Sequence, residues 1–166
     1  TRLLTSVRYR LGLVQRGEAL RLARRGRFHD AQWAFARASG LTPDSDDSWT
    51  GLAQYLEAKG GLSLKIAALQ ASLGRGGGRH AQSALLVAMI RADRAAEAIA
   101  LTESISDPDA ALSAAMDIAA AGHHAQAERF ARWSTVLAPK RADAWFQLGS
   151  VYAGLSRYDD AVAALE

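Results

Sequence analysis

Residues 142–166 read ADAWFQLGSVYAGLSRYDDAVAALE, and this stretch decides the fold. Trp145, Leu148 and Tyr152 are spaced i, i+3 and i+7, which places all three on one face of a helix. A short turn leads to a second helix that carries the small residue Ala161 where a neighbouring helix must come close. One such helix pair cannot bury its apolar face alone, so the pattern predicts several stacked copies.

Copies of this helix pair recur along the chain. The residues at the small position of each second helix are Ala31, Lys65, Ala98, Ala127 and Ala161. They are separated by 34, 33, 29 and 34 residues. The chain therefore resembles the tetratricopeptide-repeat family, whose helix–turn–helix unit has about 34 residues. The resemblance implies an all-α fold, a right-handed superhelical solenoid of about five helix pairs that is irregular in the middle.

We expect a single solenoid over residues 1–166. Its predicted repeats span 12–45, 46–78, 79–107, 108–141 and a truncated 142–166. Lys65 stands where a small residue is expected, and a slip of one or two residues would put Ile66 or Ala67 there, so the sequence leaves this register open. Because the chain begins without Met and stops inside a helix pattern, we expect it to be a piece of a larger protein.

Residues 74–78, GRGGG, interrupt the repeat pattern. Each glycine lowers helix propensity by about 1 kcal/mol relative to alanine, and none has a side chain to pack. We therefore predict a hinge at residues 74–78, where stacking between the second and third repeats should be weakest.

Trp49 and Trp145 occupy the position at which the family packs a large residue between helices, so we expect both to be buried. Replacing a buried tryptophan by alanine typically costs about 3–5 kcal/mol, which is the loss expected for Trp145→Ala. Trp33 and Trp133 belong to second helices, and the pattern does not decide their burial.

The composition excludes several classes of protein and site. The chain is 49% apolar, contains no cysteine and has no apolar run of the roughly 18 residues that cross a bilayer. Disulfides, thiolate metal sites and direct membrane insertion are therefore not expected. Residues 1–40 carry a net charge of +7, but no aromatic residue lies among the arginines from Arg16 to Arg27 to stack on bases. We expect no nucleic-acid partner.

No pattern in the sequence points to an enzyme, a cofactor or a metal. Residues 74–78 lack the Gly-Lys-Ser/Thr ending of a phosphate-binding loop. His123 and His124 are adjacent on a helix and diverge by about 100°, so they do not share an ion easily. We therefore expect a non-catalytic protein without a cofactor, and the sequence does not indicate its compartment.

The resemblance implies a concave groove lined by first helices that binds a protein or peptide partner. Carrying the lining positions over to this sequence gives Arg16, Leu20, Thr50, Gln54, Ser83, Val87, Leu112, Met116, Phe146 and Ser150. The Asn-containing clamp with which one branch of the family grips a terminal carboxylate is absent, because the chain has no Asn. Val87, Leu112 and Met116 could instead pack against neighbouring helices.

We expect a protein–protein interaction scaffold that presents this groove to a peptide or helix. An alternative is a regulatory or docking module of a larger bacterial enzyme, or of an envelope polysaccharide or secretion machine, with its catalytic or pore part elsewhere.

Overall fold

The computed structural model describes residues 2–102 and 104–166, with side chains described from residue 11 onward within that part. This part of the chain forms ten helices and no strand, which confirms the predicted all-α repeat of helix pairs. The chain divides into two compact units, Thr1–Ala81 and Gln82–Glu166.

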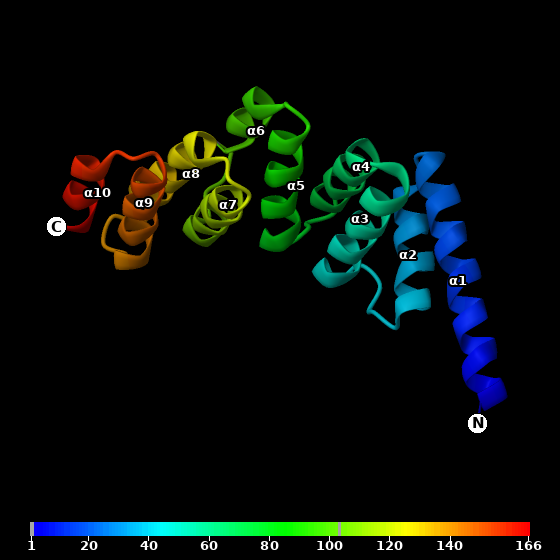
Figure 1. Cartoon of the computed structure of the whole chain (residues 1–166). Helices are drawn as coiled ribbons and strands as arrows, with labels where there is room; N and C mark the ends of the chain where they lie inside the picture. Colours follow the sequence, from blue (N-terminus) through cyan, green and yellow to red (C-terminus); the bar gives the residue numbers. More distant parts are fainter. Residues whose placement is uncertain (1, 103) are drawn as a thin grey trace. The chain divides into compact units, whose positions relative to one another are not determined.

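The first unit contains two pairs of helices. Its helices are α1 (Arg2–Arg24), α2 (Phe28–Ser39), α3 (Asp46–Gly60) and α4 (Leu62–Leu73). α1 packs on α2 and α3 packs on α4, as the neighbouring ribbons in Figure 1 show. Each pair is therefore a helical hairpin of the kind that the sequence pattern predicts.

Trp49 belongs to the core of the first unit. It is 2% exposed and packs with Leu52 and Leu56 of its own helix against small residues of α1 and α2. These small residues are Ala19, Ala23, Ala31 and Ala34. Because alanine side chains end at Cβ, the helices can approach closely around the indole ring. The predicted burial of Trp49 is confirmed.

The second unit repeats this construction. Its helices are α5 (Arg79–Arg91, which begins at the end of the first unit), α6 (Ala95–Thr102), α7 (Pro108–Ala120), α8 (His124–Leu137), α9 (Ala142–Gly154) and α10 (Tyr158–Leu165). α7 packs on α8, α8 on α9, and α9 on α10. Ile118, Phe130 and Val151, one from each of α7, α8 and α9, are fully buried and form part of its core.

Four turns inside the described helix pairs end the first helix in the same way. A backbone N–H donates to the carbonyl five residues earlier, in the bonds from Arg27 to Leu22, Arg94 to Met89, His123 to Ile118 and Arg157 to Tyr152. The residue before each donor has a positive φ; these residues are Gly26, Asp93, Gly122 and Ser156. Together these features form the Schellman motif, which stops one helix and lets the chain reverse into the next.

Lys65 is the fourth residue of α4. In each described pair, the fourth residue of the second helix donates its N–H to the carbonyl of the residue before that helix. The donors are Ala31, Lys65, Ala98, Ala127 and Ala161. Lys65 shares this place in its helix with the alanines but not their burial, because Ala31, Ala98 and Ala127 are fully buried. Its half-buried side chain forms an ion pair of 2.5 Å with Glu57, and the neighbouring Ile66 enters the core.

Trp145 differs from the prediction, because its side chain is 38% exposed. Its indole N–H donates to the carbonyl oxygen of Pro139 at 2.8 Å. In the first unit, the last turn of α4 at Ser72 and the following loop lie beside Trp49.

The glycines after α4 are explained by close backbone approach. Gly76, with φ of +80°, lies at the end of α4, and the N–H of Gly77 donates to the carbonyl of Ser72 at 2.9 Å. A Cβ added to Gly77 would lie 2.9 Å from the Ser72 backbone, and one on Gly78 would lie 2.8 Å from the Asp46 carboxylate. Larger residues at 77 and 78 would therefore displace their neighbours.

Among the described helices, none combines the length with the hydropathy that a bilayer-spanning segment needs.

Candidate functional site

In the first unit, the structure places the four predicted groove residues on α1 and α3. Arg16 and Gln54 are exposed, whereas Leu20 and Thr50 are half-buried. The Arg16 guanidinium lies 5.9 Å from the centre of the Phe35 ring, and the Thr50 hydroxyl donates to the backbone carbonyl of Asp46 at 2.9 Å. Leu20 packs against the core of the unit. Three of these four residues are therefore engaged inside the unit.

Two predicted groove residues of the second unit are buried, which corrects the prediction for them. Ser83 of α5 is 1% exposed and Leu112 of α7 is 8% exposed. The Ser83 hydroxyl donates to the carboxylate of Asp117, and Leu112 is part of the apolar core. Both residues were assigned to the groove by carrying over the family's lining positions, which identify a helix face without showing how closely the next helix covers it.

The remaining predicted groove residues of the second unit reach its surface. Val87 is half-buried, and Ser150 is exposed. Met116 of α7 is 52% exposed and Phe146 of α9 is 65% exposed. α7 and α9 are first helices of consecutive pairs and contact each other. We call the exposed side of α7 and α9 that carries Met116 and Phe146 the first-helix face.

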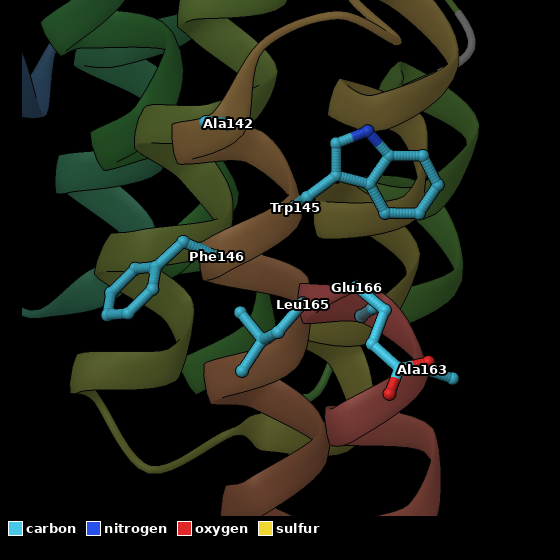
Figure 2. A pocket seen from close by; sticks show the side chains of 7 residues that line it. Ala142, Trp145, Phe146, Ala163, Leu165 and Glu166 are labelled. Carbon is cyan, nitrogen blue, oxygen red and sulfur yellow. The ribbon is translucent and has the colours of Figure 1, made fainter.

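Next to Phe146, the end of α10 leaves a cleft of about 550 Å³. Its lining residues are Ala142, Trp145, Phe146, Ala163, Ala164, Leu165 and Glu166. Figure 2 shows that Trp145 and Phe146, although adjacent in sequence, point to different sides of α9. Phe146 lies on the first-helix face and also lines this cleft. The repeat spacing did not predict that Trp145 would line a cleft as well.

A charged cluster ties α7 to α9 at one edge of the first-helix face. The Arg141 guanidinium binds the carboxylates of Asp109, near the start of α7, and of Asp143, near the start of α9. The hydrogen bond from Arg141 lowers the pKa of Asp143 below its ordinary value, against a smaller opposing effect of desolvation. Both carboxylates are thereby paired with the same cation inside the unit.

Sequence reasoning did not select Asp117, which follows Met116 on α7. Its side chain is exposed, and its carboxylate accepts a hydrogen bond from the buried Ser83 hydroxyl. The pattern held no signal for this contact, because Ser83 and Asp117 lie on helices of different pairs. The contact fixes an exposed carboxylate one residue after the exposed Met116 along α7.

The part of the chain that the structure describes holds no group of three or more His, Asp or Glu side chains arranged to bind a metal ion.

No family model matches the sequence, and no curated protein matches it either. Three solved structures illustrate what the fold is similar to. A crystal structure of MamA is 18% identical, with a TM-score of 0.43, and the match covers 87% of this chain and 88% of that one. TTC0263, a thermophilic TPR protein of Thermus thermophilus, is 17% identical, with a TM-score of 0.47 and coverage of 92% and 87%. YrrB, described as a TPR protein with an unusual peptide-binding site, is 17% identical, with a TM-score of 0.40 and coverage of 90% and 80%.

The fold assignment follows from the chain itself. Its helices form hairpins, its second helices place a residue at a recurring, equivalent position, and its turns repeat one backbone motif. The chain has a tetratricopeptide-like fold of stacked helix pairs.

Proposed function

We propose that this chain is a non-catalytic protein-interaction module and that the first-helix face of its second unit binds a peptide or helix of a partner protein. The observation that supports this function is the exposure of Met116 and Phe146. A methionine that is 52% exposed and a phenylalanine that is 65% exposed lie on two first helices in contact. Exposed apolar side chains of this size on helices that contact each other are typical of interaction sites, because covering them releases water from apolar surface.

The two residues suit such a role in different ways. Methionine is flexible and adapts to the shape of an apolar partner. Phenylalanine offers a large rigid ring at a low cost in conformational entropy. We therefore expect a partner segment with apolar side chains spaced to reach both α7 and α9, for example i and i+4 on a helix.

Selection from a random displayed-peptide library tests this function even though the natural partner is not identified. We expect the wild-type chain to enrich apolar peptides and the double variant Met116→Ser/Phe146→Ser to enrich none. The matched control is Val136→Ser/Tyr158→Ser, which removes two apolar residues of similar exposure from the second helices α8 and α10. This control should select the same peptides as the wild type. Equal enrichment by both double variants would refute the proposed role of the first-helix face.

A further inference from the structure

Asp117 is a carboxylate whose position is fixed by the protein. The Ser83 hydroxyl that donates to it is buried, so the donor cannot turn freely toward water. In the described chain, Ser83 is also the only hydrogen-bond or ion-pair partner of Asp117. The carboxylate is exposed and lies next to Met116 in the sequence of α7. The Ser83 hydroxyl therefore holds one side of the carboxylate, and the other side is open to solvent.

The local electrostatics do not offset a negative charge at this position. Asp117 lies in the last turn of α7, which ends at Ala120. The helix dipole is negative at that end, so no positive end of a helix faces the Asp117 carboxylate there. Asp109 and Asp143, in contrast, lie in the first turns of their helices and share the cation of Arg141. Asp117 thus carries a charge that nothing described in its own unit neutralises.

We infer that the first-helix face selects a partner segment in which a lysine or arginine accompanies the apolar residues, and that Asp117 determines this preference. The inference rests on the proposed function. A carboxylate held by a neutral hydroxyl keeps its full charge and its remaining lone pairs for a cationic donor. Ser83 is a positioning residue, because it holds the carboxylate but is too buried to contact a partner itself. An acidic partner segment would instead be repelled by the negative charge of Asp117, so the first-helix face favours basic over acidic partner segments.

The same peptide selection, followed by binding measurements, tests this inference. We expect the peptides enriched by the wild type to combine apolar residues with Lys or Arg. One enriched peptide is then compared with its Lys→Gln version by fluorescence anisotropy. The wild type should bind the Lys version about tenfold or more tightly, as expected for a charge-assisted hydrogen bond. Asp117→Asn should bind the two versions equally while still enriching apolar peptides.

Two further variants separate positioning from general structural damage. Ser83→Ala should reduce the ratio of the two affinities while leaving the affinity for the Gln version unchanged. Asp159→Asn, which removes another exposed carboxylate at the start of α10, should leave the ratio unchanged. If wild-type selection yields apolar peptides without basic residues, or if the preference survives Asp117→Asn, the inference is wrong while the proposed function stands. If no peptide is enriched at all, both fail.

Discussion

Two residues with left-handed backbone conformation at the turns of the helix pairs are not glycine. Asp93 and Ser156 both have φ of 59°, whereas the equivalent residues of other pairs are Gly26 and Gly122. For a residue with a Cβ, this conformation costs roughly 1–2 kcal/mol, partly offset because glycine loses more entropy on folding. We therefore expect Ser156→Gly to stabilise the chain by about 0.5 kcal/mol and Gly122→Ala to destabilise it. Thermal melting checks both, and a destabilising Ser156→Gly would contradict the assigned turn.

The two tryptophans at the packing position should differ in their contribution to stability. Trp49→Ala removes a fully packed indole and should cost about 3–5 kcal/mol of unfolding free energy. Trp145→Ala removes a ring that is 38% exposed and should cost about 1–2 kcal/mol. Denaturant unfolding of the two variants measures the difference. Equal losses would mean that Trp145 is covered in solution.

The contrast between these tryptophans shows where the sequence pattern stops being informative. The i, i+3, i+7 spacing selects the helix face, and it placed Trp49 in the core correctly. Burial, however, also depends on how far the opposite helix extends, and the spacing around Trp145 contains no such information. The same reason explains Ser83 and Leu112, which share a helix face with exposed residues but lie under a neighbouring helix.

At the scale of elements, Arg141 joins the first turns of α7 and α9 through Asp109 and Asp143. The pKa of Asp143 is lowered in the folded state by the hydrogen bond from Arg141. A lowered carboxyl pKa adds stability above the unfolded-state value, and this stability is lost as the pH falls through the folded-state value. We therefore expect the second unit to lose stability as the pH falls below about 4, the ordinary range for Asp.

The matched variant for this pH effect is Arg141→Gln. It keeps a polar side chain but removes the cation, so the pH dependence of unfolding between roughly pH 4 and pH 2 should become shallower. Exchange of backbone amides in α7 and α9 reports the effect locally. An unchanged slope in this range would show that Arg141 does not hold the two carboxylates in solution.

The order and the limits of the helices were largely predictable, because the apolar period and the turn residues are local signals. Contacts between helices of different pairs were not predictable in this way. The bond from Ser83 to Asp117 spans 34 residues, which is the length of one repeat, but the repeat pattern does not say which polar side chains pair between repeats.

At the scale of the whole molecule, residues 74–78 stay a predicted hinge. Gly77 and Gly78 pack closely within the first unit, so the hinge cannot be inferred from glycine content alone. If the segment is a hinge, trypsin should cleave first after Arg75 or Arg79, and amide protons of residues 74–78 should exchange faster than those of α4. Protection equal to that of α4, or earlier cleavage within α1, would contradict the hinge.

The central claim is that a partner segment binds the first-helix face, and the two methionines of the chain allow a direct test. Met116 is 52% exposed on this face, whereas Met89 is 1% exposed in α5. Methyl NMR of the protein labelled at methionine therefore gives one reporter at the site and one in the core. On titration with a peptide enriched by the wild type, we predict that the Met116 methyl signal shifts and saturates while the Met89 signal stays in place. A peptide that binds without moving the Met116 signal would contradict the account.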